Sequence, residues 1–476
     1  MNDTMNYING DWVVPDRALP GQLADANSGA PLAPQMGSSG KQVEAALAAA
    51  HQAYIDGRWS DIPATERAQK LLLVAQELES RAAAIAEADA LQTGVVISLT
   101  EKFALLCAAA FRGAAALLDD DGAETRLPGP HGELLLERLP LGVAAVIAPW
   151  NAPSGIACHK LASALAAACP TILKPSEWAP GSAQLIAEAV VAAGLPDGVF
   201  QMLHGAADTG GLLVVDERTA VVSFTGGLQG GRAVAHACAE SIKPAQLELG
   251  GNNPLLVLAD ASLDAAADGV VTAITTLNGQ WCRALGRLLV HESVMTDLLD
   301  KVAERLQQVI IGSSLAASSA MGPLVHEAHL RHVQEALARY VAMGAELRQY
   351  GELPDLEGWF MQPTLVCGLN PELTIEEIFG PVAAVHSFAD DAAAVALANQ
   401  TPYGLAAYVF GEEQHAWKIA RQIRTGMTKI NGVTMLNLNP QAPRPAWGLS
   451  GLGDEGTRET FEFFRGSRLI GVADRH

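Results

Sequence analysis

From about residue 140 onward, short apolar runs alternate with stretches of helical periodicity, and this alternation constrains the fold more than any other feature of the chain. Five of the runs have the length and composition of buried strands: 143–148, 170–173, 199–203, 220–224 and 247–249. Three stretches between them have a helical period: 157–168, 181–194 and 230–241. Buried strands connected by crossover helices form a parallel sheet, so the pattern predicts an α/β fold.

A second series of the same kind begins near Asn253 and predicts a second α/β domain. Its expected strands lie at 254–258, 286–291, 383–388, 405–410 and 427–431. A chain of 476 residues is too long for one ordinary core, which agrees with two domains that meet near residue 250. Before residue 140, two stretches are expected to form amphipathic, alanine-rich helices: 43–57 and 62–92.

One short segment, Glu133–Glu137 (ELLLE), has the pattern of a strand but belongs to neither series. An isolated strand leaves backbone groups unpaired unless another strand covers its edges. We therefore expect this segment to pair with a partner subunit.

The charge balance and the apolar pattern exclude some classes of function. Lysine and arginine number 31 against 52 acids, a formal net charge of −21, and an acidic surface repels a phosphate backbone. Residues 1–12 lack the apolar core of a signal peptide, and the apolar runs are too short to span a bilayer. We therefore expect no nucleic-acid partner and no membrane partner.

The cysteines are scattered, without a CxxC pair or a His/Cys cluster, at positions 107, 158, 169, 238, 282 and 367. This spacing argues against a disulfide framework and against a bound metal. It is typical of a protein of the reducing cytoplasm, where we expect the chain to act.

Four segments become informative when they are considered together: Pro149–Pro153 (PWNAP), Lys174–Glu177 (KPSE), Glu248–Gly251 (ELGG) and Asn278–Arg283 (NGQWCR). Each has an ordinary structural explanation on its own. A lone cysteine usually packs in a core, a strand-end glutamate is usually solvated, and an asparagine beside a proline usually forms a turn.

Three side chains in these segments are those that thioester chemistry requires. Cys282 lies in a loop at the boundary of an element, and Glu248 ends a buried strand before two glycines. Asn151 follows the carboxyl end of the first predicted strand, where ligands bind in open parallel sheets. A thiol, a carboxylate and a side-chain amide can serve as nucleophile, base and oxyanion donor.

At these residues the chain closely resembles the aldehyde dehydrogenase superfamily. The Asn of PWN, the KPSE segment, the Glu of ELGG and the Cys of GQxC occur in family order, with the expected spacing from Glu248 to Cys282. The resemblance spans nearly the whole chain and continues in four further segments: Tyr7–Trp12, Phe224–Gly227, Glu377–Val382 and Tyr403–Ala407.

The resemblance implies NAD-dependent oxidation of an aldehyde to the carboxylic acid. Cys282 would attack the carbonyl carbon, while the Asn151 amide and the Cys282 backbone N–H would stabilise the oxyanion. The thiohemiacetal would pass a hydride to the nicotinamide, and Glu248 would activate the water that hydrolyses the resulting thioester. Lys160 matches a family lysine thought to help to relay protons.

The resemblance also implies a set of NAD contacts. Lys174 and Glu177 would contact the adenosine ribose, and the turn 226–231 would bind the pyrophosphate through N–H groups at a helix N-terminus. Glu377 would bond the nicotinamide ribose, and Phe379 would pack against the nicotinamide. The full set of expected cofactor residues is Ile147, Pro149, Trp150, Lys174, Ser176, Glu177, Gly226, Gly227, Gly230, Leu249, Glu377 and Phe379.

The chain departs from the family pattern near the expected substrate tunnel. Non-aromatic residues stand where many relatives have aromatic ones: Ala152, His159, Leu438 and Arg444. Ala152 would widen the tunnel beside Asn151, which favours a bulky aliphatic or aromatic aldehyde. Trp281 could stack on a ring or fill the core, and Arg283 and Arg444 could form structural salt bridges or clamp the carboxylate of a semialdehyde.

The expected architecture has an NAD-binding, Rossmann-like domain (1–121 and 141–249), an α/β catalytic domain (250–450) and a small β oligomerisation element (122–140 and 451–476). The resemblance implies a homodimer or a homotetramer. The alternatives to a bulky-aldehyde dehydrogenase are a semialdehyde dehydrogenase, a coenzyme-A-acylating enzyme and an inactive structural or binding homologue. Retention of Glu248 favours hydrolysis, and its retention together with Cys282 and Asn151 argues against an inactive protein.

Overall fold

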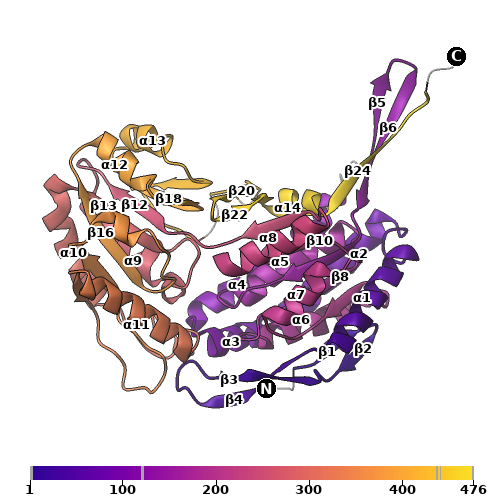
Figure 1. The fold of residues 1–476 in the computed structure, drawn as a ribbon, viewed down its shortest axis with the longest axis horizontal. Helices are drawn as coiled ribbons and strands as arrows, with labels where there is room; N and C mark the ends of the chain where they lie inside the picture. The colour runs from indigo at the N-terminus through magenta and orange to yellow at the C-terminus, as the bar shows by residue number, and fades with distance from the viewer. Residues whose placement is uncertain (1–3, 120–122, 436–437, 440, 474–476) are drawn as a thin grey trace.

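A computed structural model describes residues 4–119, 123–435, 438–439 and 441–473, and it has the α/β fold that the sequence predicts. Two lobes lie side by side, each built on a mostly parallel sheet, and a narrow arm projects from the first lobe (Figure 1). The last strand of the chain returns from the second lobe to this arm.

The first lobe is built on an eight-stranded sheet in the order β2-β1-β9-β8-β7-β10-β11-β22. Its central strands are parallel: β9 (Phe200–Met202), β8 (Thr171–Lys174), β7 (Val143–Ile147), β10 (Thr219–Thr225) and β11 (Ala245–Glu248). Its antiparallel edge strands are β1 (Asn6–Ile8), β2 (Asp11–Val13) and β22 (Gly451–Leu452). The strands predicted for the first series are confirmed, with ends that differ by at most two residues.

Side chains alternate between the two faces of this sheet, as the pleat of a strand requires. In β7, Ala144 and Val146 face one core, whereas Val143, Ala145 and Ile147 face the other. The first core is covered mainly by α2 (Ala64–Ser80), α3 (Ala82–Thr93), α4 (Ile97–Leu117), α5 (Pro153–Ala166) and α6 (Gly181–Ala192). The second core is covered by α1 (Gly40–Ile55), α7 (Ala207–Val215) and α8 (Leu228–Glu240). β7 is therefore apolar on both faces, whereas β11 has two buried polar side chains, Gln246 and Glu248, on one of them.

The stretch 62–92, expected as one helix, forms the two helices α2 and α3. The break lies at Arg81, whose φ of −104° and ψ of 1° are not helical. Leu78 and Ile85 are both fully buried on either side of the break, so the apolar period continues across it. The single-helix prediction is wrong because this continuity conceals the break.

The second lobe is built on a seven-stranded sheet that is parallel except at β14. In order, its strands are β14 (Glu346–Gln349), β15 (Thr364–Cys367), β16 (Val382–Phe388), β13 (Leu285–His291), β12 (Asn253–Val257), β18 (Ala406–Phe410) and β19 (Met427–Ile430). Its helices are α9 (Leu263–Thr275), α10 (Met295–Gln307), α11 (Glu327–Ala342), α12 (Asp391–Ala398) and α13 (Glu413–Ala420). The five strands predicted for the second series all lie in this sheet. The sequence does not predict β14 and β15, which have four residues each, and β14 also lacks an apolar run.

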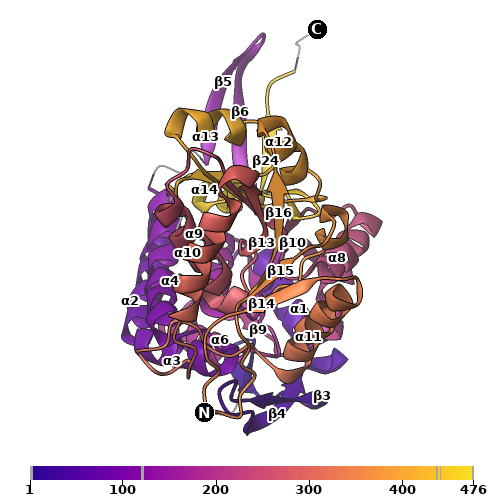
Figure 2. The ribbon, with the colours of Figure 1, turned by 90° about the vertical axis from the view of Figure 1, so that its left-hand side faces the viewer.

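The arm is a three-stranded antiparallel sheet in the order β24-β6-β5, and a side view shows it rising away from the lobes (Figure 2). Its strands are β5 (Glu124–Gly129), β6 (Gly132–Pro140) and β24 (Arg465–Ile470). The ELLLE segment lies in β6, between two strands of its own chain. The expectation that this segment pairs with a partner subunit is therefore wrong for Leu135–Glu137, because both edges there are already bonded within the chain.

The segment 451–464, which is part of the expected oligomerisation element, lies against the first lobe. β22 extends the first sheet beside β11, and α14 (Thr457–Phe463) packs on α4 and α5. The remaining short elements are β3 (Arg17–Ala24), β4 (Pro31–Gly37), β17 (Tyr403–Gly404), β20 (Arg444–Pro445), β21 (Trp447–Gly448), β23 (Asp454–Glu455) and 3-10 turns at Thr276–Gly279, Glu292–Val294 and Pro371–Thr374. The assignment of these parts to functional domains stays a prediction.

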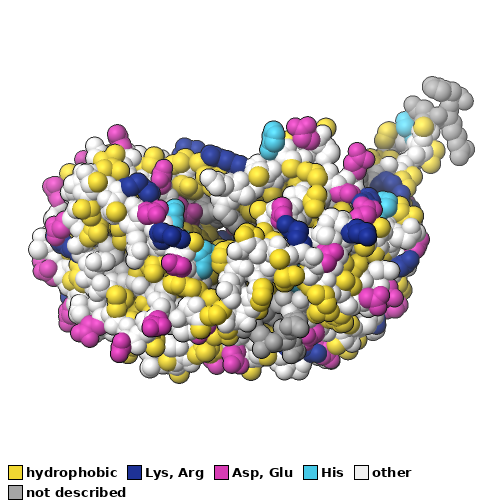
Figure 3. Space-filling model, turned by 60° about the horizontal axis from the view of Figure 1, so that its bottom comes forward, with side chains coloured by type: hydrophobic (Ala, Val, Ile, Leu, Met, Phe, Trp, Pro, Cys, Tyr) yellow, Lys and Arg dark blue, Asp and Glu magenta, His cyan; other side chains and the backbone are white. Residues whose placement is uncertain are grey.

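The surface agrees with the acidic composition. On the face shown in Figure 3, acidic and basic side chains are scattered singly over both lobes among apolar and other polar atoms. Within the described ranges, no helix has the length and apolar character that would let it cross a membrane.

The side chain of one asparagine, Asn278, forms hydrogen bonds with residues of both lobes. The Asn278 side chain donates to the carbonyls of Gly94 and Pro323, both at 2.8 Å, and accepts from the backbone N–H of Gly322 at 2.8 Å. Gly94 ends α3 in the left-handed region, with φ of 76°, and a Cβ there would meet the Pro323 carbonyl at 2.2 Å. The end of α3 in the first lobe is thus held to the loop that precedes α11 in the second.

We predict that Asn278→Ala lowers the free energy of unfolding by about 2–4 kcal/mol, because it leaves three buried backbone groups without their partner. Equilibrium urea denaturation would measure the change. Gln76→Ala on the exposed face of α2 is the matched control, with an expected change below about 0.5 kcal/mol. Equal stability of Asn278→Ala and the control would contradict the prediction.

Candidate active site

A cavity of about 550 Å³ lies between the lobes, at the carboxyl ends of the strands of the first sheet. The strand order changes direction between β7 and β10, which is where ligands bind in open parallel sheets. The turns that follow β7, β8, β10 and β11 line one side of the cavity, and the second lobe contributes Cys282, Glu377 and Phe379. All twelve expected cofactor residues line this cavity, together with Asn151 and Glu248.

Asn151 reaches from the end of β7 toward the loop that carries Cys282. Its side-chain Nδ2 donates to the carbonyl of Gln280 at 2.9 Å, and the residue is 7% exposed. This bond uses one of the two N–H groups of the amide and fixes the orientation of the other. The amide is therefore held at the loop that leads to Cys282, and its second N–H has no partner among the described residues.

The loop before Cys282 has an unusual backbone. Leu277, Asn278 and Gly279 all have positive φ, at 54°, 58° and 73°. Such a run is strained for side-chain-bearing residues and persists only where surrounding contacts hold it. Asn253 supplies further contacts downstream, because its Nδ2 donates to the carbonyls of Cys282 at 2.9 Å and Ala284 at 2.8 Å.

Cys282 is half-buried at the wall of the cavity. Burial raises the pKa of its thiol to about 12, the guanidinium of Arg283 lowers it, and the carboxylates of Glu248 and Glu377 raise it further. In the protein without ligands, Cys282 is therefore a thiol at neutral pH and needs a base to become the nucleophile.

Glu248 ends β11 and is 5% exposed. Burial raises its pKa to about 8, and the charge of Glu455 adds to this increase, while Lys160, Arg283 and Arg444 act in the opposite direction. Among the described residues, its Oε1 is buried without a hydrogen-bond partner. A carboxyl group with this pKa exchanges protons near neutral pH, as a general base must.

Lys160 lies behind Glu248 and outside the cavity wall. Its Nζ donates to Gln246 Oε1 at 2.7 Å and forms an ion pair with Glu455. Arg444 binds the other oxygen of Glu455 at 3.2 Å and donates to His159 Nε2 at 2.9 Å. Burial would raise the pKa of Glu455, but Lys160 and Arg444 outweigh it and hold that pKa well below its usual range.

Three residues that depart from the family pattern, and Arg283 beside Cys282, lie in different surroundings. Arg444 and His159 belong to the buried charge network around Glu455, which agrees with a structural salt bridge for Arg444. Leu438 is 72% exposed. Arg283 is 8% exposed, and among the described residues it forms no ion pair and its Nε has no partner.

Apolar side chains form a cluster beside Cys282. The cluster contains the buried residues Val95, Phe103, Leu277, Trp281 and Ala284, with the partly buried Leu99, Ala152, Cys282, Val433 and Met435 packed against them. Trp281 is 6% exposed and lies within this cluster. A group attached to a carbonyl at Cys282 would meet hydrocarbon in this cluster.

The other side of the cavity fits a dinucleotide. α8 begins at Leu228 without a side-chain cap, so its first N–H groups are free to bind an anion. Gly226, Gly227 and Gly230 line the cavity at this helix end, and the Thr225 hydroxyl there is buried without a hydrogen-bond partner among the described residues. Free N–H groups and a hydroxyl are the donors that a diphosphate needs.

Lys174 and Glu177 lie at the end of β8, 3.7 Å apart between Nζ and Oε2. Burial lowers the pKa of Lys174, and Glu177 raises it. Small apolar residues of α7 and α8 form a slot beside this pair: Ala207, Gly210, Gly211, Val214, Ala233, Val234 and Ala237. The sequence analysis missed these residues, although their spacing of three and four on each helix is a signal that could have found them.

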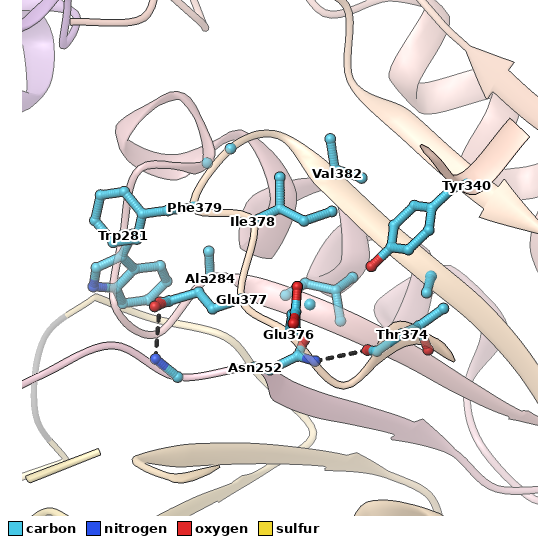
Figure 4. Close-up of a pocket in the computed structure, with 16 residues that line it drawn as sticks. Asn252, Trp281, Ala284, Tyr340, Thr374, Glu376, Glu377, Ile378, Phe379 and Val382 are labelled. Carbon is cyan, nitrogen blue, oxygen red and sulfur yellow. Dashed lines mark hydrogen bonds between the residues drawn. The ribbon is translucent and has the colours of Figure 1, made fainter. Parts of the chain in front are cut away.

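Glu377 and Phe379 lie on a turn of the second lobe, where Glu377 Oε1 accepts from the backbone N–H of Gly251 at 2.8 Å (Figure 4). Burial raises the pKa of Glu377 to about 7, and the bond from Gly251 lowers it. The same view shows Asn252 reaching the Thr374 carbonyl, at 2.8 Å. A Cβ at Gly250 would meet Glu377 Oε2 at 1.8 Å, so a side chain at this position would displace the Glu377 carboxylate.

Comparison with known proteins relates this arrangement to a known family. Residues 22–470 match the model of the aldehyde dehydrogenase family. Aspartate-semialdehyde dehydrogenase (non-phosphorylating) of Halomonas elongata is 34% identical over 94% of this chain and 92% of its own. Geranial dehydrogenase of Castellaniella defragrans is 32% identical over 94% of each chain.

Comparison with solved structures leads to the same family. Betaine aldehyde dehydrogenase of Staphylococcus aureus in complex with NAD+ superposes with a TM-score of 0.93, at 28% identity, over 98% of this chain and 94% of that one. These relatives share the fold and differ in the aldehyde that their names state.

We predict that alkylation of Cys282 by iodoacetamide in the coenzyme-free protein rises about tenfold per pH unit between pH 7 and 9.5, because only the thiolate reacts. The raised pKa places the whole of this range below the midpoint of the titration. Mass spectrometry of the peptide that contains Cys282 would follow the rate, with Cys282→Ala as the control for labelling elsewhere. A rate that reaches a plateau below pH 8.5 would contradict the prediction.

Proposed function

We propose that this chain, which belongs to the aldehyde dehydrogenase family, oxidises a bulky, uncharged aldehyde to its carboxylic acid through a thioester on Cys282. It is an NAD-dependent enzyme. One observation supports the proposal most strongly: the thiol, the Asn151 amide and the Glu248 carboxyl group meet at one cavity wall, beside an apolar cluster.

The first step is attack of the Cys282 sulfur on the carbonyl carbon. The C–S bond forms, the carbonyl π electrons move to oxygen, and the thiol proton leaves to a base. Bulk water takes up this proton, and Glu248, whose Oε1 is buried without a hydrogen-bond partner among the described residues, remains available as the base for the hydrolysis step. The free Asn151 N–H and the backbone N–H of Cys282 donate to the oxyanion.

Collapse of the oxyanion then leaves an acyl group on sulfur. NAD+, when bound, supplies the acceptor for the hydride that leaves the thiohemiacetal carbon. Glu248 removes a proton from the water that attacks the thioester, and the Cys282 thiolate is the leaving group. We propose that Lys160 and Glu455 conduct this proton away, because they are bonded to each other behind Glu248.

The cofactor roles are proposals of the same kind. The N-terminus of α8 would bind the pyrophosphate, with Gly226, Gly227 and Gly230 leaving room for it. Lys174 and Glu177 would hold the adenosine ribose, and Glu377 and Phe379 the nicotinamide end. The remaining cavity residues of this set would shape its walls: Ile147, Pro149, Trp150, Ser176 and Leu249.

The apolar cluster around Cys282 supports a bulky aliphatic or aromatic substrate. Ala152 is partly buried within it and next to Asn151 in the chain, and a side chain this small would leave room for a substrate beside the proposed oxyanion donor. Buried apolar surface is worth about 0.8 kcal/mol per methylene, so a longer substrate binds better until the space is filled.

A second candidate is a semialdehyde, and Arg283 is the observation that favours it. A guanidinium that is 8% exposed without an ion-pair partner among the described residues could bind the carboxylate of such a substrate. We place this candidate second because the side chains that pack around Cys282 are hydrocarbon.

Two further rivals receive less support. A coenzyme-A-acylating enzyme has no need of a water-activating carboxylate, and Glu248 lines the cavity. An inactive homologue has no need of Cys282, Asn151 and Glu248 at one wall. We propose a homodimer or homotetramer acting in the cytoplasm, and the six free cysteines support a reducing compartment.

We predict that Glu248→Gln gives a burst of NADH equal to the enzyme concentration. Steady-state turnover should then be at least about 100-fold slower than in the unsubstituted enzyme, because the base acts in hydrolysis. Stopped-flow absorbance would show the burst, and mass spectrometry of the quenched protein would show the acyl adduct on Cys282. Cys282→Ala is the control and gives neither phase. Full steady-state activity of Glu248→Gln would remove the assigned role.

We predict that kcat/KM rises about fourfold for each added methylene from acetaldehyde upward until the pocket is filled. Phenylacetaldehyde or octanal should then be preferred over succinic semialdehyde in initial-rate assays. Arg283→Leu should leave that order unchanged. If succinic semialdehyde is preferred and Arg283→Leu removes the preference, the semialdehyde candidate is correct and the ranking proposed above is wrong.

A further inference from the structure

His329, on α11, lies against the turn that carries Glu377 and Phe379. Its Nε2 is 2.8 Å from the backbone carbonyl oxygen of Phe379. Since a carbonyl only accepts, Nε2 carries the hydrogen and donates it. Burial lowers the pKa of His329 to about 4, so the ring is neutral at physiological pH and the bond fixes its tautomer.

The carbonyl that accepts this bond belongs to a strained residue. Phe379 has φ of 60°, in the left-handed region that a side chain disfavours. A conformation of this kind persists when its surroundings specify it. His329 is a side chain from another element that bonds directly to the strained peptide.

Trp150 connects this contact to the first lobe. Its ring lies 5.4 Å from His329 and 5.4 Å from Phe379 between centroids, edge-on to both. Trp150 immediately precedes Asn151, so the same indole touches the turn of the second lobe and borders the oxyanion donor. The three rings join the two walls of the cleft at one end of the cavity.

Two other histidines, His326 and His332, lie next to His329. His326, which precedes α11, accepts the backbone N–H of His329 at Nδ1, 3.0 Å away, and its ring lies 3.9 Å from that of Trp178 between centroids. His332, one turn further along α11, is exposed and lies 6.0 Å from His329 with its ring nearly parallel. The helix thus presents one buried histidine to the turn and one exposed histidine that does not touch it.

We propose that His329 is a positioning residue for the nicotinamide end of the coenzyme site. It fixes the peptide of Phe379, and through that peptide it sets the place of the Glu377 carboxylate and the Phe379 ring. The inference rests on the proposed contact of Glu377 and Phe379 with the nicotinamide half of NAD, and it does not depend on which aldehyde is oxidised.

The experiment measures how much each half of the coenzyme contributes to binding. Isothermal titration with NAD+ and with AMP would be carried out on the full-length protein and on His329→Leu, His329→Gln, His332→Leu and Glu377→Gln. We expect His329→Leu to raise the Kd for NAD+ about tenfold, the worth of one lost hydrogen bond, and to leave the Kd for AMP within about twofold. His329→Gln, which retains an N–H donor, should restore most of the NAD+ affinity, and His332→Leu should change neither constant.

Three results would overturn the proposal. If Glu377→Gln weakens NAD+ binding and His329→Leu does not, His329 has no positioning role. If His329→Leu weakens NAD+ and AMP equally, or lowers Tm without rescue by His329→Gln, its role is general packing. If Glu377→Gln also leaves NAD+ binding unchanged, the assignment of the nicotinamide end is wrong and the inference fails with it, while the thioester chemistry of Cys282 remains separately testable.

Discussion

The site depends on buried side-chain amides that hold the backbone of the loop before and after Cys282. This loop has three consecutive residues of positive φ, and regular secondary structure supplies no ladder to hold such a path. Asn278 anchors its start to both lobes, Asn253 anchors its end, and Asn151 bonds its middle at the Gln280 carbonyl. The Asn151 amide and the loop of Cys282 are therefore held by one hydrogen-bond system.

Two buried glutamates near this loop, Glu248 and Glu455, are accompanied by the cations Lys160 and Arg444. Glu248 and Glu455 are both buried, and two like charges at such a site cannot both be ionised without nearby cations. Lys160 and Arg444 bind Glu455 directly, which leaves Glu248 as the carboxyl group that titrates near neutral pH. One glutamate is held in its charged form so that the other can take up and release protons.

The sequence predicted the strands well because a strand buried on both faces leaves a continuous apolar run, and it placed Asn151 and Glu248 because strand ends of a parallel sheet meet at one edge. It did not predict the anchoring role of Asn278. That role depends on contacts with Gly94 and Pro323, which are far apart in the chain and follow no period. Periodicity likewise could not decide between a clamp and a salt bridge for Arg444, because its partner Glu455 is defined only by the folded chain. Periodicity also concealed the break at Arg81, because the apolar period continues from α2 into α3 without interruption.

The order of the strands has a consequence for how the chain is made. The hairpin of β5 and β6 is complete by residue 140, yet β24, which covers the other edge of β6, begins only at Arg465. In the same way, β11 ends at Glu248, but β22, which pairs with its outer edge, begins only at Gly451. During synthesis one edge of β6 is therefore left uncovered for more than half of translation and one edge of β11 for a shorter period, and such edges pair readily with other chains. The nascent chain thus passes through its most aggregation-prone state while the second lobe is being made, and this state ends only when the last strand docks.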